Sequence, residues 1–129
     1  CLEQYASATG LVRLAKRYFE KNTKNSILTG KEITAKEVFD AAKAGDAAAL
    51  EITEEFGAYL GQALVNLAAT VDPAVFVIGG GVSKAGDILL ETVRKYFYDH
   101  AFYGNQKTKI TLATLGNDAG IYGAAKQVL

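Results

Sequence analysis

The chain has 129 residues and a mass of 13.7 kDa, a size that suits one domain and leaves little room for two. It carries 14 basic and 14 acidic side chains, so its formal net charge is zero. This neutrality argues against a protein that mainly grips nucleic acid or an anionic membrane. Half of the residues are hydrophobic and 22% are charged, a balance that argues against disorder.

Cysteine and histidine usage limits the metal chemistry. The single Cys, at position 1, and the single His are too few to hold zinc unless carboxylates complete the ligand set. The first residue is not Met, so we expect either a processed chain or a piece of a longer one. The longest uncharged stretch, residues 56–71, contains Gln, Asn and Thr, which favours a buried helix over a transmembrane span.

The first third of the chain predicts two helices separated by a polar loop. Residues 2–22 have apolar side chains at helical spacing, although Gly10 interrupts the pattern. Residues 23–33 are polar and predict the loop. Thr34 and Glu37 then match a capping box, which predicts that a short helix begins there.

A long helix is predicted next. Gly45 ends the short helix and Asp46 is placed to cap the following one. That helix extends to about Thr70 and is apolar nearly all round, which predicts burial on several sides. Gly57 and Gly61 form a pair of small residues one turn apart, which would let another backbone approach closely.

The remainder predicts strands that alternate with helices. Residues 75–78 are a continuous apolar run, typical of a strand covered on both faces. Ser83 or Asp87 is placed to cap the next helix. A second strand is predicted at 110–115 and a last helix, capped by Asp118, up to residue 128. This order favours a parallel sheet covered by helices, and two strands alone make a poor sheet.

Three consecutive glycines, Gly79, Gly80 and Gly81, follow the first strand. Glycines there allow positive φ and let the backbone approach a ligand, and free N–H groups before a helix favour an anion. The Rossmann spacing fails because its third glycine would be Lys84, and the Walker A spacing fails because Asp87 follows Gly86. From these residues alone, contact with a nucleotide and a merely tight turn remain equally open.

Three segments in order resemble a known family. IGGGVS, residues 78–83, is similar to the adenosine motif of the sugar kinase, hsp70 and actin superfamily. CLEQYASATG, residues 1–10, resembles the end of the ROK-family signature, and LGNDAGIYGAA, residues 115–125, resembles that family's C-terminal segment. Within the family, the first and last segments look most like bacterial glucokinases of the Gram-positive type.

The resemblance implies an α/β fold over residues 1–129. The chain would be the C-terminal lobe of an actin-like, ribonuclease H-like ATPase, rich in helices and with a partial parallel or mixed sheet. The complete enzyme would use ATP and Mg²⁺ to phosphorylate glucose at the 6-hydroxyl. It would be cytoplasmic and a homodimer, with no nucleic-acid or membrane partner. The catalytic Asp and the first phosphate loop would lie in the other lobe, so we expect this chain alone to be inactive.

The resemblance also assigns roles to particular residues. Gly79, Gly80, Gly81 and Val82 match the adenosine and phosphate contact, while Glu3 matches a glutamate that binds sugar hydroxyls. The alternative for Glu3 is an ordinary first-turn glutamate, favoured there by the helix dipole.

Cys1 matches the last ligand of a structural zinc site. Because its partner ligands are absent, the resemblance implies a chain cut at that cysteine, with the site incomplete and the metal not bound. The alternative for Cys1 is a free thiol. For Asp118, in an Asn-Asp pair like that of the family's catalytic Asp, helix capping is favoured over catalysis.

The alternatives for the whole chain come from different classes. One is the sugar-sensing lobe of a ROK transcriptional repressor. Another is a ROK kinase for N-acetylmannosamine, N-acetylglucosamine, fructose or allose. A third is a stand-alone interaction domain. The aromatic set at 96–103 is expected to pack in the core, with a dimer interface as the second reading, and His100 is expected at or near the surface.

Overall fold

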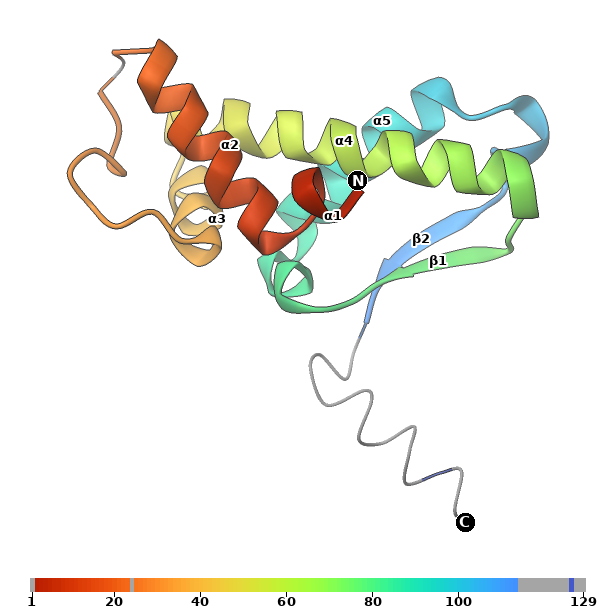
Figure 1. Ribbon diagram of the computed structural model, residues 1–129. Helices are drawn as coiled ribbons and strands as arrows, with labels where there is room; N and C mark the ends of the chain where they lie inside the picture. Colours follow the sequence, from red (N-terminus) through yellow and green to blue (C-terminus); the bar gives the residue numbers. More distant parts are fainter. Residues whose placement is uncertain (1, 24, 114–125, 127–129) are drawn as a thin grey trace.

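The computed structural model describes residues 2–23, 25–113 and 126. Its helices form a layer over one face of a small sheet (Figure 1). The elements in chain order are α1 (Leu2–Tyr5), α2 (Ala8–Lys21), α3 (Ala35–Lys43), α4 (Ala47–Val71), β1 (Val75–Ile78), η1 (Gly81–Ala85), α5 (Asp87–His100), η2 (Tyr103–Asn105) and β2 (Lys109–Leu112). The helix-rich α/β class predicted from the sequence is confirmed.

The predicted helix at 2–22 is two helices. Ser7 caps α2, because its Oγ accepts a hydrogen bond from Gly10 N at 3.1 Å. A Cβ added at Gly10 would lie 2.7 Å from the carbonyl oxygens of Gln4 and Tyr5. The expected interruption of the helix exists, but it lies before Gly10, between α1 and α2. Gly10 itself lets the end of α1 pack against α2.

The helix ends around α3 follow the sequence signals. Thr34 Oγ1 accepts from Glu37 N at 3.2 Å, which confirms the predicted N-cap. Gly45 has φ +89°, and the amides of Gly45 and Asp46 donate to the carbonyl oxygens of Ala42 and Ala41. This is a Schellman ending, the arrangement for which glycine is preferred at a helix C-terminus.

Asp46 joins the loop at 25–33 to α4. Its Oδ2 accepts from Ala49 N at 2.9 Å and from the Ser26 hydroxyl at 2.8 Å, and its Oδ1 accepts from Ile27 N at 3.1 Å. Burial by itself raises the pKa of Asp46, but these three hydrogen bonds outweigh it and hold the pKa below its ordinary value of 3.8. The predicted cap is confirmed, and it also anchors the loop.

We expect Asp46→Ala to lower the free energy of unfolding by about 1–2 kcal/mol, because the α4 cap is lost together with two loop contacts. Since folding lowers the pKa, the charged form stabilises the fold above pH 3.8, and this contribution is lost as the pH falls through the lowered value. Urea unfolding at several pH values measures both effects. Asp46→Asn is the control, because it keeps an acceptor for Ala49 N but should lack the loss of stability at acid pH. If the stability of Asp46→Asn depended on pH in the same way as that of the unchanged protein, the role of the carboxylate would be contradicted.

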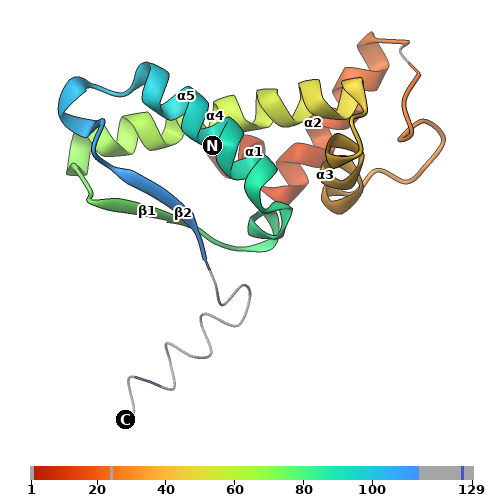
Figure 2. The same ribbon diagram turned by 180° about the vertical axis from the view of Figure 1, so that it is seen from behind.

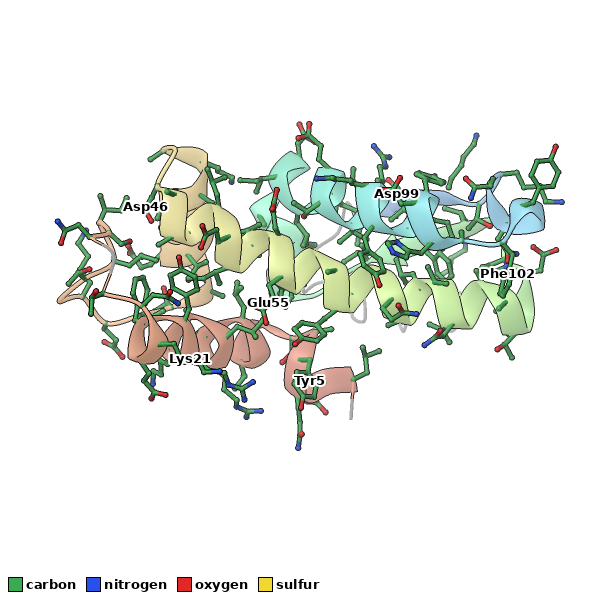
Figure 3. The ribbon with its side chains drawn as sticks, turned by 90° about the horizontal axis from the view of Figure 1, so that it is seen from above. Tyr5, Lys21, Asp46, Glu55, Asp99 and Phe102 are labelled. Atoms are coloured by element: carbon green, nitrogen blue, oxygen red, sulfur yellow. The ribbon has the colours of Figure 1, made fainter. Side chains whose placement is uncertain are left out.

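Helix α4 lies between α2 and α5 (Figure 3) and also contacts α1 and α3. A Cβ at Gly57 would lie 2.7 Å from Thr92, and one at Gly61 would lie 2.9 Å from the ring of Tyr96. The predicted close approach at these glycines is thus confirmed, and α5 is the helix that makes it. The expected burial on several sides holds only in part, because exposed apolar side chains occur along the whole length of α4, at Leu50, Tyr59, Leu67 and Val71. In the part of the chain that is described, no helix is both long and apolar enough to cross a membrane.

The two strands pair in parallel, as predicted, with Val75 opposite Lys109. Among the described residues the sheet is covered on one face only: Ile78 and Ile110 are buried under the helices, whereas Val75 is 45% and Val77 is 60% exposed. Both views place α4 and α5 on the same side of the strands (Figures 1 and 2). The expectation that β1 is covered on both faces is therefore wrong here, because its alternate side chains face solvent.

Helix α5 is fastened to β2 by Arg94, whose Nε and Nη2 donate to Ile110 O at 3.2 and 2.6 Å. Strand β2 begins one residue before the predicted start at 110 and ends at Leu112, so the predicted strand is wrong at Ala113. Residues 114–115 of the predicted strand, the turn at 116–117 and the predicted last helix with its Asp118 cap lie outside the described residues, except for Lys126.

Candidate functional site

The glycine turn after β1 is held in a conformation that requires glycine at its centre. Gly80 has φ +81° and ψ −168°, a region that residues with a side chain adopt only under strain. Ser83 fixes the turn, because its N and its Oγ both donate to Gly80 O, at 3.1 and 2.7 Å. The positive φ expected among the three glycines is therefore confirmed at Gly80.

The predicted cap of the following helix is wrong. Gly86, with φ +72°, precedes α5, and no side chain caps the helix there. Asp87 is the first helical residue, where its charge suits the helix dipole. Ser83 instead lies in η1 and uses its hydroxyl on the glycine turn, because the η1 turn separates the glycines from the helix.

The turn is open on its outer side. Among the described residues, a Cβ added at Gly80 or Gly81 would meet no atom within 4 Å, and one at Gly79 would meet only Ala113 Cβ at 3.6 Å. Val82, in contrast, is 8% exposed and belongs to the hydrophobic core. Of the four residues matched to nucleotide contact, the three glycines thus leave backbone accessible, and Val82 could contribute only through its main chain.

A pocket of about 300 Å³ lies between the glycine turn and α3. Figures 1 and 2 both show α3 beside the segment that follows β1, and the two elements are in contact. The lining consists of Ala35, Lys36, Phe39, Asp40, Lys43, Gly81, Lys84 and Ala85. Sequence reasoning missed the α3 residues. The available signal was their spacing, because positions 36, 39, 40 and 43 share one helical face.

The other predicted site residues lie elsewhere. Glu3 is exposed on α1 and does not line the pocket beside the glycine turn. Cys1 and Asp118 lie outside the described residues. Within 2–23, 25–113 and 126, no group of three or more His, Cys, Asp and Glu side chains is placed to hold a metal ion.

The aromatic set is divided between core and surface. Phe97 is fully buried and packs edge-on against Phe76, with ring centroids 5.9 Å apart. Phe102 and Tyr103 are 66% and 96% exposed beyond the end of α5 (Phe102 is labelled in Figure 3). Core packing is therefore confirmed for Phe97 and wrong for these two, because the chain leaves the helix layer there. The expected surface position of His100 is also confirmed: it is exposed and its ring stacks on that of Tyr96 at 3.9 Å.

The sequence pattern of the ROK family matches residues 1–129. The chain belongs to the ROK family. It is 42% identical over 128 residues to a glucokinase of Halalkalibacterium halodurans, a match that covers 95% of this chain and 39% of that protein. It is 30% identical over 125 residues to an N-acetyl-D-glucosamine kinase of Photobacterium profundum, covering 97% of this chain and 38% of the relative.

A ROK-family glucokinase from Streptomyces griseus, solved in complex with glucose and AMPPNP, has the same fold. The TM-score is 0.88 at 35% identity, with 98% of this chain and 44% of that chain covered. The fold is therefore that of the ROK sugar kinases, which is the actin-like ATPase fold. The chain spans about two fifths of the length of the curated relatives it matches.

Proposed function

We propose that this chain is the C-terminal portion of an ATP-dependent glucokinase, which phosphorylates glucose at its 6-hydroxyl. The observation that carries the proposal is the 42% identity to the glucokinase of Halalkalibacterium halodurans across 95% of this chain. The open glycine turn, fixed by Ser83, adds support, because it leaves backbone accessible where the family resemblance expects adenosine. The Streptomyces griseus relative was solved with glucose and AMPPNP, a sugar and a nucleotide like the two substrates proposed for this protein.

Each proposed role uses the chemistry that the residue offers. Gly79, Gly80, Gly81 and the main chain of Val82 contact the nucleotide, which the glycines permit because no side chain intervenes. Glu3 accepts hydrogen bonds from sugar hydroxyls, a task that suits a carboxylate. ATP supplies the phosphoryl group, with Mg²⁺ bound to it. The catalytic base comes from a part of the enzyme outside residues 1–129, and Cys1 completes a structural zinc site there.

A segment exchange tests the proposal. Residues 1–129 replace the matching part of the Halalkalibacterium halodurans glucokinase, and ATP-dependent glucose phosphorylation is measured. We expect activity within about tenfold of the parent enzyme, because mismatched contacts between the two parts should raise the activation free energy by only a small part of its height. The 129-residue chain alone should be inactive. A soluble, cooperatively folded exchange protein without activity would overturn the proposal, and activity of the isolated chain would overturn the assignment of the base.

Glu3→Gln in the exchange protein should raise KM for glucose by roughly 10- to 100-fold, because hydrogen bonds to a charged group contribute about 1.5–3 kcal/mol. KM for ATP should not change. Glu20→Gln, on the exposed surface of α2, is the matched control. Equal KM for glucose in the two variants would leave Glu3 as an ordinary helix-terminal glutamate.

A kinase for N-acetylhexosamine is the second candidate, and the 30% identity to an N-acetyl-D-glucosamine kinase favours it. It ranks lower because the match to a glucokinase reaches 42%. A repressor lobe ranks lower again, because a repressor has no need for an open, glycine-lined turn. We also propose, from the family resemblance, that the complete protein is a cytoplasmic homodimer; the exposed Phe102 and Tyr103 are of the kind that interfaces favour.

A further inference from the structure

The pocket between α3 and the glycine turn is lined by both apolar and charged side chains. Its lining includes the apolar side chains of Ala35, Phe39 and Ala85. Phe39 is 4% exposed and meets the ring of Phe56 edge-on at 6.2 Å, so this part of the lining is fixed by the core. An apolar surface held in this way suits a flat, apolar part of a ligand.

Charged side chains surround this apolar surface. Lys36, Lys43 and Lys84 line the pocket together with one carboxylate, that of Asp40. Three positive charges and one negative charge give the lining residues a net charge of two positive. The pocket is therefore suited to an anion that also carries a flat apolar group, and a nucleotide has both. Its volume of about 300 Å³ falls in the lower range of small-molecule sites.

The fold holds the α3 side chains in a fixed relation to the turn. Lys36 lies in the first turn of α3 and Lys43 is its last residue, two turns further along the same face. The helix is capped by Thr34 at one end and closed by Gly45 at the other. Lys84 approaches from η1, directly after the glycines. The three lysines thus line one pocket from two different elements.

We propose that α3 forms the second wall of the nucleotide site, and that Lys36, Lys43 and Lys84 bind the anionic part of the nucleotide while its base lies near Phe39. This inference rests on the proposed function, because it assigns further residues to the same nucleotide. It adds the α3 wall and the three lysines, none of which belongs to the glycine motif.

Amine labelling in the exchange protein tests the assignment. Lysines are acetylated with and without saturating ADP, and the extent at each residue is read by mass spectrometry. We expect ADP to slow labelling of Lys36, Lys43 and Lys84 by at least threefold. Lys95, which is exposed on α5 and lines a separate pocket, is the internal control and should be unaffected. Adenosine and pyrophosphate, added separately, should each protect less than ADP.

The outcomes separate the two proposals. If glucose is phosphorylated but ADP at a concentration that raises Tm leaves Lys36, Lys43 and Lys84 unprotected, the α3 wall is wrong and the glucokinase stands. If the lysines are protected but no sugar is phosphorylated, the nucleotide pocket stands and the proposed function fails. Pyrophosphate protecting as well as ADP would reduce the site to an anion site and overturn the placement of the base. Lys36→Gln should raise KM for ATP severalfold, whereas Lys95→Gln should not.

Discussion

Gly81→Leu in the exchange protein is expected to raise KM for ATP by 100-fold or more while leaving the fold intact. Gly81 lines the pocket beside α3, and a Cβ there meets no atom of the residues that the structure describes within 4 Å. Its φ is not in the positive range, so a larger residue fits the backbone, at a cost below about 1 kcal/mol. The leucine side chain would instead fill space that the nucleotide needs. Steady-state kinetics and urea unfolding of the same preparation measure the two effects.

Two other glycines serve as comparisons for Gly81. A Cβ at Gly104 also meets none of the described atoms within 4 Å, and its φ is not positive. Because Gly104 lies in η2, away from the pocket beside α3, Gly104→Leu should change neither KM for ATP nor stability. Gly80→Leu should lower stability by about 1–3 kcal/mol, because its φ of +81° is strained for any other residue. A Gly81→Leu variant with normal KM for ATP would show that the nucleotide does not approach the glycine turn.

Gly57→Leu should lower the free energy of unfolding by about 3 kcal/mol, the upper end of the usual cost of overpacking. The new Cβ would lie 2.7 Å from Cβ and Oγ1 of Thr92 and 3.2 Å from its carbonyl carbon. Because backbone is involved, α5 must move away from α4 as a whole. Replacing a helical glycine returns only about 0.5–1 kcal/mol, so the clash dominates. Urea unfolding followed by circular dichroism measures the loss.

The control for Gly57 is Ala69→Leu, which introduces the same side chain on the exposed side of α4 and should be nearly neutral. A double-mutant cycle locates the clash. Gly57→Ala alone should destabilise, and combining it with Thr92→Gly should recover part of the loss, because the Cβ of Thr92 is the atom in contact. If the two changes in the free energy of unfolding simply add, the contact between Gly57 and Thr92 is not the cause of the destabilisation.

Local signals in the sequence were sufficient for both ends of α3 and the start of α4, but not for the start of α5. The caps at Thr34 and Asp46 and the ending at Gly45 depend on residues within one turn, so their types predict the geometry directly. The cover over β1 could not be predicted in this way. Val75 and Val77 are as apolar as their neighbours, and only the position of α4 and α5 decides which face is buried.

In the candidate site, too, the features that depend on local sequence were predictable and those that depend on packing were not. The glycine turn was recognisable because its conformational requirement belongs to the residues themselves, and Gly80 confirms it. The α3 wall was not, because Lys36 and Lys43 read as ordinary charges on an amphipathic helix. Their relation to Gly81 appears only when α3, α4 and the segment after β1 are packed together.

The joint at Gly45 and Asp46 has a mechanical consequence for that wall. Only residues 44–46 connect α3 to α4, and the Asp46 carboxylate that caps α4 also accepts hydrogen bonds from the amide of Ile27 and the hydroxyl of Ser26. Helix α3 is therefore fixed at its C-terminal end to α4, the longest helix described, and is not a hinged segment that could open and close. Any closure around a ligand must then come from something that moves toward α3, while α3 stays in place.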